Sequence, residues 1–198
     1  MTEETVRTFI AFAIGEALIE KIGSLQKELK PLKLDVKTVD PRKIHLTLKF
    51  LGDTPVASLE AVHNAMEEVV KRHSAFELSV DTFGAFPNFR TPRVLWVGCK
   101  EPSGQAEALA HDLNESLSLL GFKKEEKKFA PHLTLARLRS LKNEKRLAAF
   151  VEGYTLPWKE TLSCETLTHY KSTLTPQGAL YEPLHTVTLN GEANSSER

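Results

Sequence analysis

The chain has 198 residues, of which 41% are hydrophobic and 26% charged, so it is long enough for a sizeable core and has the composition of a globular protein. Its 26 basic residues balance 26 acidic ones, which argues against a protein that coats a long polyanion, because nonspecific affinity for nucleic acid comes mostly from neutralised phosphates. Cys99 and Cys164 stand too far apart to suggest a disulfide framework or a zinc ribbon. No apolar run is long enough for a signal peptide or a membrane span, so we expect a cytoplasmic protein that does not insert into membranes.

The first half of the chain predicts strands and helices in alternation. A compact apolar run from Phe9 to Phe12 indicates a strand that is buried on both faces. A helix follows, and its apolar stripe is Leu18, Ile22, Leu25 and Leu29. The predicted elements are a strand at 7–14, a helix at 16–30, strands at 35–39 and 43–50, and a helix at 55–73.

The second half of the chain predicts a similar order of elements. These are strands at 76–86 and 93–99, a helix at 103–120, a strand from residue 132, a helix at 141–152, and strands at 162–170 and 181–189. Residues 190–198 have almost no apolar content, and we expect them to form a loose tail.

This order of elements predicts the fold class. Strands that follow one another without an intervening helix require antiparallel pairing, which favours an α+β fold over a wound parallel sheet. Because the order occurs twice, we expect one domain over residues 1–198 with two pseudo-symmetric lobes. Each lobe is expected to be an antiparallel sheet with helices on its outer face, and the ligand site is expected in the central cleft between them.

The most informative motif is the word His-Leu-Thr-Leu, which occurs at His45–Leu48 and again at His132–Leu135. In a strand, residues i and i+2 point to the same face, so each copy presents a histidine together with a threonine. Two such strands facing one another supply an acid, a base and two neutral groups that can hold an anion. This set is sufficient to break a phosphodiester without a metal or a cofactor. The alternative is a duplicated core strand whose histidines and threonines face solvent.

These motifs carry a resemblance that spans nearly the whole chain. The chain resembles the 2H phosphoesterases, and among them the RNA 2′,3′-cyclic phosphodiesterases, also called 2′-5′ RNA ligases. The matching stretches are Arg7–Ala11, Ile44–Gly52, Gly84–Pro87, Arg93–Gly98 and Pro131–Arg137, with a late pattern of Ser172, Leu174, Pro176, Gly178 and Tyr181.

The resemblance implies a metal-independent and cofactor-free hydrolase that opens 2′,3′-cyclic phosphate ends of RNA or nucleosides to 2′-phosphomonoesters. It implies that His45 is the general acid on the leaving O3′ and that His132 is the general base on water, although the symmetric motifs alone do not assign these two roles. Thr47 and Thr134 are expected to hold the nonbridging phosphate oxygens. The reverse reaction would be a weak 2′-5′ ligation. The expected partner is RNA with a cyclic phosphate end, and the protein is expected to be a monomer.

Two further residues are implied by the resemblance. Phe50 and Arg137 stand five residues after the two motif histidines, where family members stack a base and hold phosphate. An offset of five points away from the histidine face of an ideal strand, so this role requires a twist or a bulge. The alternatives are Phe50 in the core and Arg137 as a surface cation.

Rival interpretations are a metal site, for which each motif offers a histidine but no nearby carboxylate or thiol, and a noncatalytic module that binds nucleotides or RNA ends. The other helical histidines, His63, His73 and His111, are expected to face solvent. The lysine-rich segment 123–128 is interrupted by two glutamates, which favours a solvated loop over a dedicated RNA-binding patch.

Overall fold

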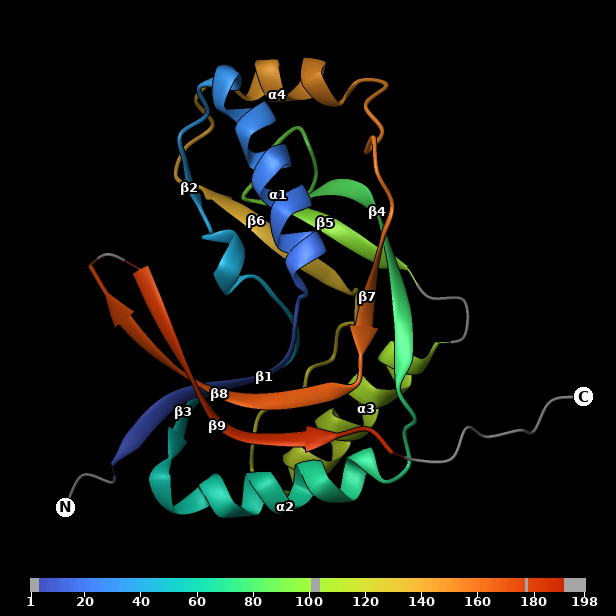
Figure 1. Cartoon of the computed structure of the whole chain (residues 1–198). Helices are drawn as coiled ribbons and strands as arrows, with labels where there is room; N and C mark the ends of the chain where they lie inside the picture. The colour runs from blue at the N-terminus through green and yellow to red at the C-terminus, as the bar shows by residue number, and fades with distance from the viewer. Residues whose placement is uncertain (1–3, 101–103, 177, 191–198) are drawn as a thin grey trace, which may run out of the picture.

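The computed structural model describes residues 4–100, 104–176 and 178–190, and the chain forms an antiparallel sheet with four α-helices around it (Figure 1). The helices are α1 (Glu16–Leu29), α2 (Leu59–Val70), α3 (Gln105–Leu119) and α4 (Glu144–Val151). The strands are β1 (Thr5–Ala13), β2 (Val36–Thr38), β3 (His45–Pro55), β4 (Phe76–Phe86), β5 (Val94–Lys100), β6 (His132–Leu138), β7 (Glu160–Cys164), β8 (Thr166–Thr175) and β9 (Gly178–Thr188). The predicted α+β class is confirmed.

The strands are hydrogen-bonded in the order β7-β4-β5-β6-β3-β1-β8-β9, and β2 pairs with β6 beside this path. Every pairing is antiparallel. The two predicted lobes are therefore the two halves of one curled sheet. They meet between β3 and β6, where the register contains the single pair Leu46 and Leu133. Both motif strands thus lie side by side at the middle of the sheet.

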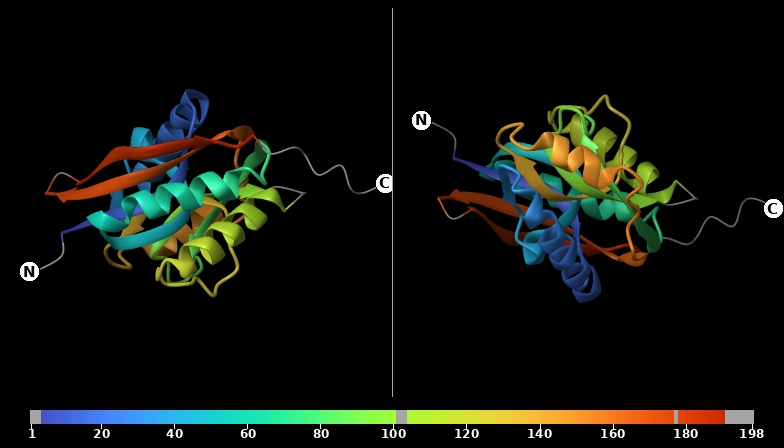
Figure 2. Two further views of the ribbon diagram at one scale, coloured as in Figure 1. Left: turned by 90° about the horizontal axis from the view of Figure 1, so that it is seen from below. Right: turned by 90° about the horizontal axis from the view of Figure 1, so that it is seen from above.

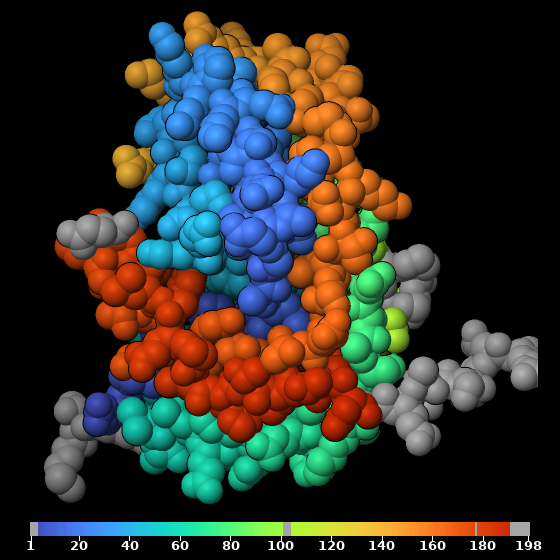
Figure 3. Space-filling view, in the orientation of Figure 1, coloured from blue at the N-terminus to red at the C-terminus, as the bar shows by residue number. Residues whose placement is uncertain are grey.

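The helices pack across the two halves of the chain. Helix α1 contacts β7, whereas α3, from the second half of the chain, contacts β3. Helices α2 and α3 lie side by side below the sheet, and α2 also contacts β9 (Figure 2). In the space-filling view, α1 and α4 cover one half of the molecule, and β8, β9 and α2 make up the other (Figure 3).

The core is built from the predicted apolar faces. Leu18, Ile22, Leu25 and Leu29 are buried along α1, as their spacing predicted. In β1 the run from Phe9 to Phe12 is buried throughout, because this strand has a neighbour on each side and packing on both faces.

Several element boundaries differ from the prediction. Strand β3 continues to Pro55, and a short 3₁₀ turn at Val56–Ser58 precedes α2, so that helix begins later than predicted. The single strand predicted at 162–170 is two strands, β7 and β8, with a break at Glu165. The predicted start of α3 at Ser103, and the predicted tail beyond Asn190, lie outside the described residues. Within the described parts of the chain, no helix is long and apolar enough to cross a membrane.

Candidate active site

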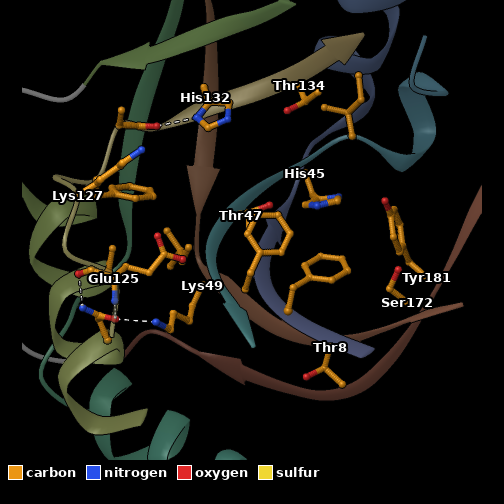
Figure 4. Close-up of a pocket in the computed structure, with 18 of the residues that line it drawn as sticks. Thr8, His45, Thr47, Lys49, Glu125, Lys127, His132, Thr134, Ser172 and Tyr181 are labelled. Carbon is orange, nitrogen blue, oxygen red and sulfur yellow. Dashed lines mark hydrogen bonds between the residues drawn. The ribbon is translucent and has the colours of Figure 1, made fainter. Parts of the chain in front are cut away.

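Strands β3 and β6 bring the two motifs to one pocket of about 860 Å³ (Figure 4). The leucines of each motif are buried, and the alternate His and Thr side chains are half-buried on the opposite face, where they line this pocket. All six residues predicted for the site line it, namely His45, Thr47, Phe50, His132, Thr134 and Arg137. The histidines and threonines therefore face a shared concavity instead of an open surface.

Each motif strand contains a β-bulge at its second leucine. Against β1, Thr47 pairs with Ala11 and Lys49 pairs with Ile10, so Leu48 is the extra residue. Against β5, Thr134 pairs with Trp96 and Ala136 with Leu95, which makes Leu135 the extra residue of β6.

An extra residue reverses the alternation of the residues that follow it. The bulges therefore turn Phe50 and Arg137 to the histidine face, as an offset of five requires. Phe50 is 56% exposed and Arg137 is exposed, so neither is a core residue.

The backbone holds both imidazoles in the same way. His45 Nδ1 lies 2.9 Å from the Lys43 carbonyl oxygen, and His132 Nδ1 lies 2.7 Å from the Ala130 carbonyl oxygen. A carbonyl oxygen only accepts hydrogen bonds, so Nδ1 carries the proton in each ring. In the neutral rings, the lone pair of Nε2 is therefore able to accept a proton or a hydrogen bond.

Aromatic rings fix the two imidazoles. Phe9 stacks on His45 with ring centroids 4.5 Å apart, and Tyr181 meets His45 edge-on at 5.1 Å. Phe86 meets His132 edge-on at 4.9 Å. These contacts exclude water, and this desolvation lowers the pKa of both histidines below 6.5, although the bond to the backbone carbonyl raises it in part. Arg137 lowers the pKa of His132 further.

A buried side chain from α1 stabilises the bulge of the second motif. Gln26 Nε2 donates to the Val39 carbonyl at 2.7 Å and to the Leu135 carbonyl at 3.0 Å. Gln26 was not predicted as a site residue, because the spacing of the apolar stripe indicates only which face of the helix is buried. The available signal was that Gln26 directly follows Leu25 of this stripe.

The β8–β9 hairpin supplies the wall beside His45. Ser172, Leu174 and Tyr181, which belong to the late pattern of the resemblance, all line the pocket. Lys43 Nζ donates to the Ala179 carbonyl at 3.1 Å and so links this hairpin to the segment before β3. Lys127 was not predicted as a site residue. It lines the opposite wall of the pocket, beside His132 (Figure 4).

Comparisons with known proteins agree with this architecture. An RNA 2′,3′-cyclic phosphodiesterase of Archaeoglobus fulgidus is 34% identical over 179 residues, which cover 90% of this chain and 98% of that protein. A protein of the same name from Aquifex aeolicus is 31% identical over 191 residues, covering 95% of this chain and all of the relative. A crystal structure from Thermus thermophilus superposes with a TM-score of 0.78 at 26% identity and covers 94% of this chain and all of its own.

The E. coli LigT structure in complex with 3′-AMP has the same fold, with a TM-score of 0.78 at 24% identity, and it covers 94% of this chain and 99% of its own. The family model described as the 2′-5′ RNA ligase superfamily matches residues 14–173. These matches, together with the paired His-Leu-Thr-Leu strands at one pocket, show that the chain belongs to the 2′-5′ RNA ligase superfamily of 2H phosphoesterases, as the resemblance predicted.

Proposed function

We propose that this protein hydrolyses 2′,3′-cyclic phosphate ends of RNA to 2′-phosphomonoesters, with His45 and His132 as a general acid–base pair. The observation that carries the proposal is that the two imidazole rings have the same hydrogen-bonding arrangement and the same tautomer. Each donates Nδ1–H to the carbonyl two residues earlier, and both side chains line one pocket. The relatives named as RNA 2′,3′-cyclic phosphodiesterases support this substrate class. That the enzyme acts as a monomer in the cytoplasm stays a prediction.

The proposed step is a displacement at phosphorus. Nε2 of His132 removes a proton from water, and the water oxygen forms a bond to phosphorus. The bond from phosphorus to O3′ breaks, and O3′ takes a proton from Nε2 of His45, which leaves a 2′-phosphomonoester. Each proton transfer therefore has both a donor and an acceptor, and the proposed step needs no metal ion or cofactor.

The neighbouring side chains act on charge and position. The hydroxyls of Thr47 and Thr134 donate to the nonbridging oxygens, and the Arg137 guanidinium offsets the charge that develops there. Phe50, exposed beside Phe9 with ring centroids 6.1 Å apart, offers a face on which the terminal base stacks. Run in reverse, with a 5′-hydroxyl in place of water, the same pair would form a 2′-5′ linkage, so weak ligation follows from microscopic reversibility.

The substitutions His45→Ala and His132→Ala test the proposal. Each is expected to lower kcat on a nucleoside 2′,3′-cyclic phosphate by about 10²–10⁴-fold, the usual contribution of a positioned acid or base. His73→Ala is the control, because His73 pairs with Asp112 at 3.0 Å and does not line the pocket. The assay contains a chelator, and the product is identified by phosphorus NMR.

Four outcomes would contradict the proposal. Activity lost with the chelator supports a metal site, binding without turnover by the unchanged protein supports a noncatalytic module, and a 3′-phosphomonoester product reverses the leaving oxygen. A His132→Ala protein with near-normal turnover ends the acid–base assignment.

A further inference from the structure

The pocket continues well beyond the two imidazoles. Its volume of about 860 Å³ lies near the upper end of the range of roughly 300–1,000 Å³ that is usual for small-ligand sites. From His132 it extends along one wall to His111 and Asn114 of α3 and to the lysine-rich segment 123–129. The sequence favoured a solvated loop here, whereas the structure places several residues of this segment at the pocket.

A buried lysine anchors this segment to the first motif strand. Lys49, four residues after His45, is 2% exposed and lines the pocket (Figure 4). Its Nζ donates to Asn114 Oδ1 and to the Lys123 carbonyl, both at 2.6 Å. Burial of an ammonium group is unfavourable unless hydrogen bonds replace its water, and it lowers the pKa of Lys49 here. A lysine kept in this environment, bonded to a loop carbonyl, points to a role in holding the loop.

Asn114 extends the anchor to a second point of the segment. Its Nδ2 donates to the Glu125 carbonyl at 3.0 Å, and its Oδ1 accepts from the Glu125 backbone N–H at 2.9 Å. The segment is therefore held at 123 and at 125 by side chains from β3 and α3. It then runs directly into Pro131 and His132, so Lys49 connects the strand of the first motif to the chain that enters the second.

Two lysines of the segment, Lys127 and Lys128, line the pocket, and one of them remains available for a ligand. Lys124 pairs with Glu115, and Lys128 lies 3.3 Å from Glu107. Lys127 is exposed, and no carboxylate of residues 4–100, 104–176 or 178–190 lies within 4.0 Å of its Nζ. In Figure 4 its side chain extends along the wall toward His132.

An aromatic ring accompanies this cation. Phe129, two residues further on, is half-buried and lines the same wall. A cation beside an aromatic face is the combination that holds single-stranded RNA, through a phosphate and a stacked base.

We propose that segment 123–129 forms a second nucleotide subsite, which binds the nucleotide that precedes the cyclic end of an RNA strand. Lys127 contacts the phosphodiester between the two nucleotides, Phe129 stacks on the preceding base, and Lys49 is the positioning residue of the subsite. This inference rests on the proposed function and deepens it, because it makes RNA ends better substrates than free cyclic nucleotides.

The test compares two substrates, a nucleoside 2′,3′-cyclic phosphate and a trinucleotide that ends in the same group. The ratio of their kcat/KM values is measured for the unchanged protein, for Lys127→Gln and for Lys145→Gln, whose lysine is exposed on α4 and does not line the pocket. We expect the unchanged protein to favour the trinucleotide, and Lys127→Gln to lower the ratio about tenfold, the usual effect of one charged hydrogen bond. The salt dependence of kcat/KM for the trinucleotide is expected to weaken in the same variant.

A ratio that Lys127→Gln leaves unchanged, or that Lys145→Gln lowers equally, overturns the subsite. If the unchanged protein hydrolyses both substrates with equal kcat/KM, the subsite proposal is contradicted and the proposed function stands. If it hydrolyses neither, the proposed function fails as well.

A double-mutant cycle tests the positioning role of Lys49. Lys49→Met keeps an unbranched side chain that is one heavy atom shorter, and it removes the hydrogen bonds to Asn114 and to the segment. If Lys49 acts by placing Lys127, Lys49→Met lowers the substrate ratio, and adding Lys127→Gln lowers it little further. Additive losses, or equal losses on both substrates, indicate a merely structural role and contradict the proposal. Should Lys49→Met fail to fold, Asn114→Ala releases the segment at Glu125 while the Lys123 contact remains, and it faces the same test.

Discussion

The two pocket histidines share an electrostatic state that would set the pH dependence of the proposed reaction. Burial lowers the pKa of His45 and of His132, so both rings are mainly neutral at pH 7 in the free protein. An anionic phosphate placed between them favours the charged form of a nearby imidazole. In the proposed mechanism, the ring that acts as acid would therefore gain its proton as the substrate enters.

The pH profile of kcat/KM is expected to be a bell centred below pH 6.5. The rate rises with pH as the base loses its proton and falls as the acid loses its own, and both pKa values of the free protein lie below 6.5. Arg137→Gln removes a charge that lowers the pKa of His132, so one limb of the bell is expected to move to higher pH. The profile is measured on a nucleoside 2′,3′-cyclic phosphate, and a maximum above pH 7 in the unchanged protein contradicts this prediction.

The packing of the Trp96 indole requires a glycine at position 84. A Cβ built on Gly84 would lie 2.2 Å from the ring of Trp96, which is in edge contact with His132 at 6.3 Å between ring centroids. Gly84→Ala must displace Trp96, and such overpacking costs about 1–3 kcal/mol of unfolding free energy. Urea unfolding measures this loss, and kcat is expected to fall with it. Gly23→Ala is the control, because the nearest atom there is 3.8 Å away and helix propensity predicts a gain of up to about 1 kcal/mol.

The two motif strands show how far local sequence patterns reach. The alternation of His, Leu, Thr and Leu predicted both strands and which face carries the imidazoles. It did not predict the bulges at Leu48 and Leu135, because these depend on the register against β1 and β5, which are distant in sequence. The family resemblance implied that Phe50 and Arg137 face the pocket. This was the only sign that the in-and-out alternation of side chains had to change along each strand.

The hydrogen bonds from Gln26 to the second bulge yield a prediction for α1. Gln26→Leu removes both hydrogen bonds to the carbonyls of Val39 and Leu135, although the Val39 N–H still donates to Leu135 at 2.9 Å. Unsatisfied buried carbonyls cost about 1–3 kcal/mol, so the unfolding free energy is expected to fall by that amount. Because the bulge directs Arg137 into the pocket, KM for the cyclic phosphate is expected to rise as well. Ser24→Ala, on the exposed side of the same helix, should leave KM unchanged and raise the unfolding free energy by no more than about 0.7 kcal/mol through helix propensity. A normal KM in Gln26→Leu would separate the bulge from substrate binding.

The arrangement of the whole molecule was predicted less completely than its elements. The doubled order of elements predicted two lobes with the motifs between them. It did not predict that the break at Glu165 sends β7 to β4, where Cys164 pairs with Phe76, and sends β8 to β1 in the other half. No local pattern marks this exchange, because the pairing partners of β7 and β8 lie far away in the sequence. The apolar content of 162–170 fits one long strand equally well.

A cluster of three histidines joins α2 to the β8–β9 hairpin. His63 stacks on His185 with ring centroids 4.4 Å apart and meets His169 edge-on at 5.3 Å. The expectation that His63 faces solvent is therefore wrong, whereas His111 is exposed as expected. His169 is fully buried, and neither of its ring nitrogens has a hydrogen-bond partner among the described residues. The nearby carboxylates are Glu60 and Glu67, and Glu67 lies 3.1 Å from His185.

This cluster predicts that the fold loses stability in mild acid. Burial and the two neighbouring imidazoles lower the pKa of His169 to about 4, so between pH 6.5 and 4 the unfolded chain binds a proton that the folded chain does not. The unfolding free energy therefore falls as pH decreases through this range, by on the order of 3 kcal/mol in total from this residue. His169→Leu removes the titrating group and two unsatisfied nitrogens, so the variant is expected to be at least as stable at pH 7 and to lose less stability at pH 5. Urea unfolding at both pH values measures the difference, and equal losses in the two proteins would show that His169 is not the group responsible.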